Sequence, residues 1–113
     1  MSRLLRDLNQ NFYPTACEFL AKCVEARLNV MVIETRRTLA QHKENVANGV
    51  SWTRHSKHID GNAIDIGIVE LLSLPNWAPD HPLWDRLGKI GESCGLKWGG
   101  RWKQRDCVHF ERQ

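Results

Sequence analysis

Two stretches of the sequence carry histidine and acidic residues at spacings that suit a metal site. The first is SKHIDGNAID at residues 56–65, in which His58 and Asp65 flank an Asp-Gly pair. Asp-Gly is typical of a two-residue β-hairpin turn. Because strand side chains alternate between faces, this hairpin would place Ser56, His58 and Asp65 on one face and three isoleucines on the other. An imidazole and a carboxylate beside an apolar layer suit a divalent metal such as zinc.

The second stretch is DCVHFE at residues 106–111, in which apolar and polar residues alternate. If its apolar residues join the isoleucine layer, His109 lies on the same side of the sheet as His58 and Asp65. Two histidines and one aspartate give three protein ligands and leave a fourth coordination position open. That pattern is typical of a catalytic zinc site, whereas a structural zinc site is usually closed by four protein ligands.

Asp106 and Glu111 are the two candidates for a general base beside this metal. Asp106 lies three residues before His109, so we expect it in the turn before the strand, from where its carboxylate could reach an attacking water. Glu111 shares the strand face of His109 and competes for the same role. It could instead orient a metal ligand through a hydrogen bond.

The elements that must position these residues indicate an α+β fold. Thr15-x-x-Glu18 is a capping-box pattern that predicts a helix start. The predicted helices cover 15–28, 38–47 and 82–94, with a short helix or an ordered arm over 3–12, and the predicted strands cover 30–33 (buried on both faces), 63–69 and 107–111. A loop is expected over 71–79 and a turn over 98–100. This order predicts helices packed on one face of a small, mostly antiparallel sheet.

Length and composition fit one globular domain over residues 1–113, with a net charge of only +3. No apolar run is long enough to span a membrane. The first residues, MSRLLRD, become charged too early for a signal peptide. The four cysteines include no Cys-x-x-Cys pair, so we expect free thiols in a protein made in the cytoplasm.

The combined motifs resemble a known enzyme family. S-x-H-x₆-D from residue 56, WGG at 98–100 and D-x-x-HFE from residue 106 are similar to the zinc peptidases that cut bacterial peptidoglycan stem peptides. That family includes D-Ala-D-Ala carboxypeptidases and dipeptidases and the L-alanyl-D-glutamate endopeptidases of phage endolysins. RTLAQ at 37–41 and ANG at 47–49 look most like the phage branch. The resemblance runs in order from about Thr35 to Glu111.

The resemblance implies a role for each matching residue. The implied Zn²⁺ ligands are His58, Asp65 and His109. Asp106 would be the catalytic base, and some family members have glutamate at this position. Arg37, chosen over its neighbour Arg36, would steady the substrate carbonyl and the developing oxyanion. Ser56 would contact the substrate, and the implied fold is the one shared with the Hedgehog signalling domain.

The resemblance thus implies a zinc metallopeptidase acting on the peptidoglycan stem peptide, with L-alanyl-D-glutamate endopeptidase activity in phage lysis. D-Ala-D-Ala carboxypeptidase activity is the alternative, because the same ligands and base serve either bond. A non-catalytic, zinc-stabilised binding module of the Hedgehog type is a second alternative, which Asp106 and Arg37 disfavour. A metal-dependent nuclease is a third, supported only by the mild positive charge.

The expected setting follows from the same features. We expect a monomer with no nucleic-acid partner and no membrane insertion. Without a signal peptide, a separate membrane lesion would release the protein to the cell wall. The remaining histidines, His42, His55 and His81, are interpreted as surface or hydrogen-bonded core residues. The tryptophans are interpreted mainly as packing residues, with Trp98 or Trp102 also lining the cleft.

Overall fold

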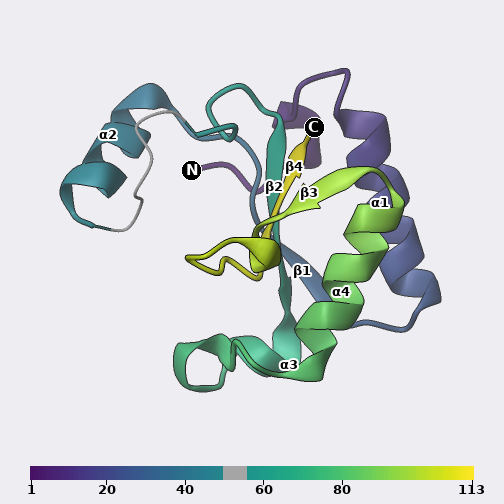
Figure 1. Cartoon of the computed structure of the whole chain (residues 1–113). Coiled ribbons are helices and arrows are strands. Elements are labelled where there is room, and N and C mark those ends of the chain that lie inside the picture. The colour runs from purple at the N-terminus through teal and green to yellow at the C-terminus, as the bar shows by residue number, and fades with distance from the viewer. Residues whose placement is uncertain (50–55) are drawn as a thin grey trace.

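The computed structural model of the chain describes residues 1–49 and 56–113, which form an antiparallel sheet with the strand order β1-β2-β4-β3 (Figure 1). The strands are β1 (Val30–Glu34), β2 (Ala63–Ile68), β3 (Leu96–Trp98) and β4 (His109–Arg112). The helices are α1 (Tyr13–Glu25), α2 (Leu39–Ala47), α3 (Val69–Leu72) and α4 (Pro82–Ser93), with short 3-10 helices η1 (Leu5–Asp7), η2 (Pro75–Trp77) and η3 (Gly99–Arg101). The predicted α+β class and antiparallel sheet are confirmed.

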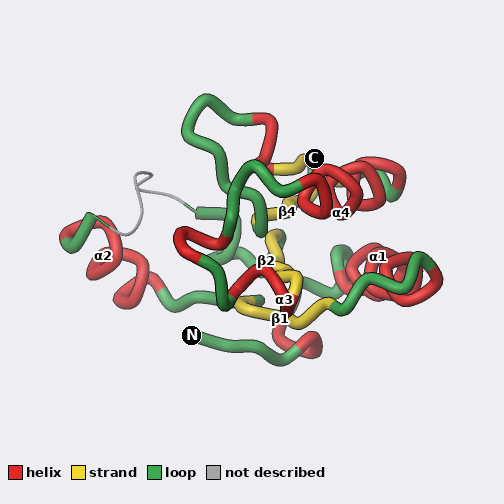
Figure 2. Tube along the Cα trace, turned by 90° about the horizontal axis from the view of Figure 1, so that it is seen from below, coloured by secondary structure: helices red, strands yellow, loops and turns green. Residues whose placement is uncertain are grey.

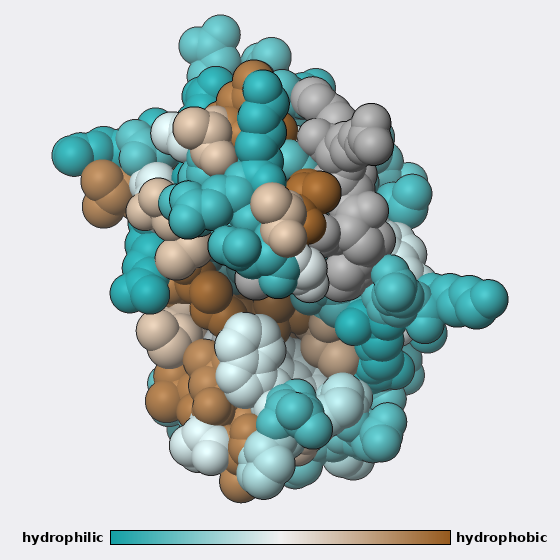
Figure 3. Space-filling view, turned by 90° about the vertical axis from the view of Figure 1, so that its left-hand side faces the viewer, coloured by the Kyte–Doolittle hydropathy of each residue, from teal (hydrophilic) through white to brown (hydrophobic). Residues whose placement is uncertain are grey.

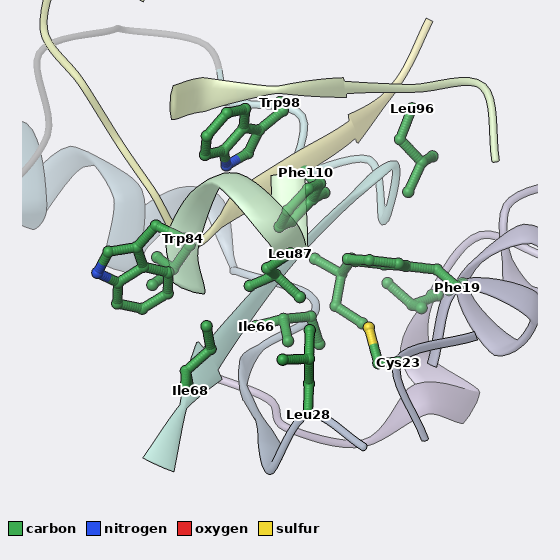
Figure 4. Packing of buried hydrophobic residues seen from close by; sticks show 14 of the residues in the cluster. Phe19, Cys23, Leu28, Ile66, Ile68, Trp84, Leu87, Leu96, Trp98 and Phe110 are labelled. Carbon is green, nitrogen blue, oxygen red and sulfur yellow. The ribbon is translucent and has the colours of Figure 1, made fainter. Parts of the chain in front are cut away.

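Helices α1 and α4 lie side by side against one face of the sheet, whereas α2 stands apart on the other side (Figures 1 and 2). The core lies between the sheet and these two helices (Figure 4). It takes Ile64, Ile66 and Ile68 from β2, each fully buried, as the strand alternation predicts. In α4, a Cβ atom at Gly88 would lie 2.4 Å from the Trp98 ring. The absence of a side chain at Gly88 therefore lets the helix approach the sheet.

The predicted hairpin at residues 56–65 is wrong. Residues 57–61 form a turn, and β2 pairs with β1 on one side and β4 on the other. Because both edges of β2 are already paired, residues 56–59 cannot form a strand beside it, as the hairpin would require. Gly61 has a φ of +73°, a conformation that favours glycine. Its carbonyl accepts a hydrogen bond from the Asn9 amide at 2.9 Å, and a Cβ there would lie 2.6 Å from the Asn9 nitrogen.

A β-bulge interrupts the pairing of β1 with β2. Val32 lies opposite Ile66, but Glu34 lies opposite Asp65, so Ile33 is the extra residue. Directly opposite residues in an antiparallel pair have side chains on the same face. The bulge therefore moves Glu34 from the core face to the face of Asp65, an effect typical of bulges near functional sites.

Other local predictions vary in accuracy. Helix α2 begins as expected, with the Thr38 hydroxyl accepting from the Gln41 amide. Helix α1 starts at Tyr13, with Pro14 in its first turn, so the Thr15 capping box is not used. Strand β1 is not buried on both faces, because Met31 is exposed. Several short elements were not predicted, among them α3, which spans the end of the expected strand and the start of the expected loop, and β3, which leads into the expected turn.

Candidate metal centre and cleft

His58, Asp65 and His109 converge on the sheet face that α1 and α4 leave uncovered. One donor atom from each residue lies within 4.8 Å of the other two. Asp65 Oδ1 lies 3.0 Å from His58 Nε2 and 3.1 Å from His109 Nδ1. Asp65 and His109 are register partners on β2 and β4, so backbone pairing sets their positions. His58 comes from the 57–61 turn.

Each histidine has a partner on its other ring nitrogen. His58 Nδ1 donates to the Thr35 carbonyl at 2.7 Å, and His109 Nε2 donates to Glu111 Oε1 at 2.8 Å. Lys57 in turn lies 3.3 Å from Glu111 Oε2. These bonds leave His58 Nε2 and His109 Nδ1 as the nitrogens directed at Asp65. Such outer partners orient ligating histidines in metal sites.

Burial and neighbouring charges shift the pKa values of Asp65, His109 and Asp106. Burial raises the pKa of Asp65, but hydrogen bonds from His109 and His58 outweigh burial and hold it well below its ordinary value. Burial lowers the pKa of His109, yet its bonds to Asp65 and Glu111 raise it to about 9. Burial and the charge of Asp65 raise the pKa of Asp106. The carboxylates thus favour positive charge at this point, whether a proton or a metal ion.

The donor set fits a transition-metal ion. Two imidazole nitrogens and one carboxylate oxygen suit zinc, and three protein donors leave a position for substrate or water. The two histidines are 1% and 7% exposed, while Asp65 is partly open to the cleft. His58, Asp65 and His109 would hold the ion, with Thr35 and Glu111 orienting the rings.

A cleft of about 1030 Å³ opens over the three donors. Figure 3 shows the molecule hollowed below α2 on this face. Asp106 lines the cleft from the loop just before β4, the expected position. Trp102 also lines it, with its ring centroid 5.1 Å from that of His109, as predicted, whereas Trp98 is buried in the core. Ser56 lines the cleft too, and its hydroxyl accepts from the His58 amide at 3.2 Å.

Arg37 reaches the same cleft from the segment between β1 and α2, while Arg36 is exposed. The Arg37 guanidinium donates hydrogen bonds to the Glu34 carboxylate and to His42 Nδ1. Glu34 was not predicted as a site residue, and His42 was interpreted only as a surface or hydrogen-bonded core histidine. The spacing of Glu34 three residues before Arg37 was a usable signal, since the two could form an ion pair. His55 lies outside the described residues, and His81 accepts from the Leu83 amide at the start of α4.

The sequence of this chain is similar to those of known peptidases. Residues 49–112 match the D-alanyl-D-alanine carboxypeptidase family. A curated L-alanyl-D-glutamate peptidase from Listeria phage A118 is 31% identical over 75 residues, which cover 66% of this chain and 27% of that protein. The chain thus spans about a quarter of that relative's length. The family match covers more than half of the chain, and the chain belongs to the D-alanyl-D-alanine carboxypeptidase family.

Two solved structures share the fold. The L-Ala D-Glu endopeptidase ChiX of Serratia marcescens superposes with a TM-score of 0.71 at 25% identity, covering 96% of this chain and 83% of ChiX. The vancomycin-resistance D,D-pentapeptidase VanY, crystallised as a variant with Zn(II), gives a TM-score of 0.58 at 14% identity, covering 93% of this chain and 72% of VanY. The fold of this chain is therefore that of peptidases of this kind.

Proposed function

We propose that residues 1–113 form a catalytic domain that hydrolyses the peptidoglycan stem peptide with zinc as its cofactor. The observation that carries the proposal is the convergence of His58, Asp65 and His109 under a cleft that Asp106 and Arg37 also line. Family membership supports peptidase activity. The Zn(II) in VanY agrees with the metal that the donor set favours.

The bond that we propose is L-Ala–D-Glu. Both the phage relative and ChiX carry that activity in their names, and ChiX aligns over nearly all of this chain. D-Ala-D-Ala carboxypeptidase activity is the second candidate, since the matching family bears that name. A carboxypeptidase needs a cation placed to bind the free terminal carboxylate. Among the described residues, the lysine and arginine side chains lining the cleft are those of Arg37, Lys57 and Arg105, and each contacts a protein acceptor.

The proposed roles of the side chains follow from their positions. Zinc, when bound, polarises the scissile carbonyl and makes water easier to deprotonate. Asp106 accepts the proton of the attacking water, a role that suits a carboxylate whose pKa burial raises. Arg37 offers N–H donors to the carbonyl oxygen as negative charge develops on it. Ser56 lines the cleft beside His58 and contacts the substrate.

We propose that Glu111 orients His109 and does not act as a base, and the geometry around His109 supports this. Its carboxylate accepts a hydrogen bond from His109 Nε2, on the side of the ring that points away from Asp65. We therefore assign Glu111 to orienting His109 and assign the base to Asp106. The retained Asp106 and Arg37 also disfavour a non-catalytic binding module.

Mass spectrometry of digested, purified peptidoglycan tests the proposal. We expect new N-terminal D-Glu on the released peptides and L-Ala left on the muramic acid. Asp106→Asn, prepared in parallel, controls for contaminating hydrolases. Release of D-Ala alone would show D-Ala-D-Ala carboxypeptidase activity in place of the proposed endopeptidase activity. Undiminished digestion by metal-free protein in a strong chelator would contradict the zinc assignment.

The proposed setting is lysis of a bacterial cell from within. Among the helices of the described ranges, none has the length and apolarity of a membrane span. We propose that the protein acts as a monomer on the cell wall, without a nucleic-acid partner, after a separate membrane lesion gives it access. Expression in bacteria with and without a membrane-permeabilising protein tests this proposal, and rapid lysis without that protein would contradict it.

A further inference from the structure

Arg37 is fixed at the cleft by two buried side chains, Glu34 and His42. Its Nε donates to Glu34 Oε2 at 3.1 Å, and its Nη2 donates to the other oxygen of the same carboxylate. Its Nη1 donates to His42 Nδ1 at 2.9 Å. Glu34 is 2% exposed and His42 is fully buried. A two-point fork with a carboxylate restrains the guanidinium plane more strongly than a single bond.

Glu34 occupies this place because of the bulge in β1. Without the extra residue Ile33, the register of Val32 opposite Ile66 would put Glu34 opposite Ile64, on the core face. With the bulge, Glu34 lies opposite Asp65, and its Oε1 is 3.8 Å from His58 Nε2. A carboxylate buried beside other carboxylates is costly unless it is paired with a cation. The pairing with Arg37 meets that requirement.

His42 connects the same guanidinium to α2. Within the described part of this helix, His42 is the residue that is buried, while the helix itself stands apart from the sheet (Figure 1). Because arginine can only donate, His42 Nδ1 must be the unprotonated acceptor. The Arg37 amide also donates to the His58 carbonyl at 3.0 Å, which ties the backbone of this segment to the turn that carries a metal-site residue.

We propose that Glu34 and His42 are positioning residues that hold Arg37 ready for the substrate oxygen; this inference rests on the proposed function. Their three bonds use Nε, Nη1 and Nη2 once each. Counting only partners in the described ranges, one N–H on each terminal nitrogen remains for the substrate. Arg37 thus meets the developing charge without first having to be ordered, which is the condition for effective electrostatic stabilisation.

Steady-state kinetics on four variants test this role. Glu34→Gln keeps the shape but removes the carboxylate charge, and His42→Leu removes the acceptor. We expect kcat to fall about tenfold to a hundredfold in each, the scale of a small misplacement of a catalytic group, with KM changing much less. His42→Asn, which can restore an acceptor near Nδ1, should recover much of the loss. Glu44→Gln, an exposed charge loss on α2, is the matched control and should behave as wild type.

The decisive comparison repeats Glu34→Gln and His42→Leu in an Arg37→Ala background. If both residues act through Arg37, they should cause almost no further loss of kcat there. Equal losses in the two backgrounds would overturn the proposal, because the residues would then act independently of Arg37. Wild-type kcat in a folded Glu34→Gln protein would overturn it as well.

A measurement without substrate separates this proposal from the proposed function. The ¹⁵N-correlated NMR signal of the Arg37 Nε–H should exchange slowly with solvent in wild type, with or without zinc. It should be lost to exchange in Glu34→Gln, while zinc content and the backbone amide spectrum outside this region are kept. A rapidly exchanging Arg37 Nε–H in wild type would overturn the inference even if the enzyme is active. A protected signal in a protein without peptidase activity would instead contradict the proposed function alone.

Discussion

Asp65 and His109 stand opposite each other on paired strands, whereas Arg37, His58 and Asp106 reach the cleft from turns and loops. On the strand side, backbone register brings the two side chains together. On the loop side, hydrogen bonds of individual residues do so, such as those from His58 to Thr35 and from Arg37 to Glu34. The difference suggests a division of labour. Under the proposed function, the strand side supplies two of the three metal ligands, and the loop side supplies the third, His58, together with Arg37 and Asp106, which are proposed to act on the substrate.

The largest expected effect comes from the one proposed ligand that lies on the loop side. His58→Ala should lose zinc and reduce activity to background. The loss of metal affinity should exceed the roughly 100-fold that removal of an outer partner costs. Metal content after dialysis, measured beside His81→Ala, checks this. Retention of one zinc per chain in His58→Ala would break the comparison, because the strands alone would then hold the metal.

Asp106→Asn should separate chemistry from metal binding. The amide cannot accept a proton, so kcat should fall about 10²- to 10⁴-fold while zinc content and folding stay as in wild type. Turnover of a soluble stem peptide, with zinc content measured on the same sample, gives both values. Near-normal turnover here, combined with an inactive Glu111→Gln protein, would exchange the roles of the two carboxylates.

Glu111→Gln acts on the strand side and should mainly weaken metal binding. Because the carboxylate orients His109 through Nε2, zinc affinity should fall roughly 10- to 100-fold. With zinc in excess, kcat should recover most of its wild-type value. Competition with a chelator of known affinity measures the first effect. A kcat that stays low at saturating zinc would show that Glu111 acts on substrate and would weaken the proposed division.

Gly88→Ala tests the support beneath the strand side and should have the smallest effect. The added Cβ would lie 2.4 Å from the Trp98 ring, so overpacking should lower the free energy of unfolding by about 1–3 kcal/mol. The kcat of the folded enzyme should not change. Urea unfolding measures this, with exposed Ser93→Ala as a control. A lowered kcat without a loss of stability would mean that packing in the core affects the positions of the catalytic groups on the loop side.

The residues of the metal centre were predicted from the sequence more accurately than the secondary structure that positions them. His58, Asp65 and His109 converge as expected, although from a turn and the paired strands β2 and β4 instead of a hairpin. The Asp-Gly pair indicates a tight turn, but it does not reveal that both edges of β2 are already paired. That information lies in the tertiary arrangement of the strands.

Glu34 and His42 were not predicted as site residues for a related reason. Strict alternation from Val32 sends Glu34 to the core face, and only the bulge at Ile33 reverses it. His42 has helical spacing typical of an ordinary packing residue. Strand β3 was missed because it has only three residues and leads directly into the glycines of the expected turn. Short elements and bulges depend on what packs against them, which local patterns do not contain.

The contact between Gly61 and Asn9 bears on the order of folding. The turn that carries His58 is bonded to a segment far away in the sequence, and that segment is itself bonded to the start of α1 through the Phe12 and Tyr13 amides. Closing so long a loop costs chain entropy, so we expect this contact to form after α1 and the sheet have come together. Hydrogen exchange during refolding can compare the Asn9 amide with those of the sheet. Because the turn depends on this contact, His58 should reach its place only after α1 has docked against the sheet. Metal binding would then be a late step of folding.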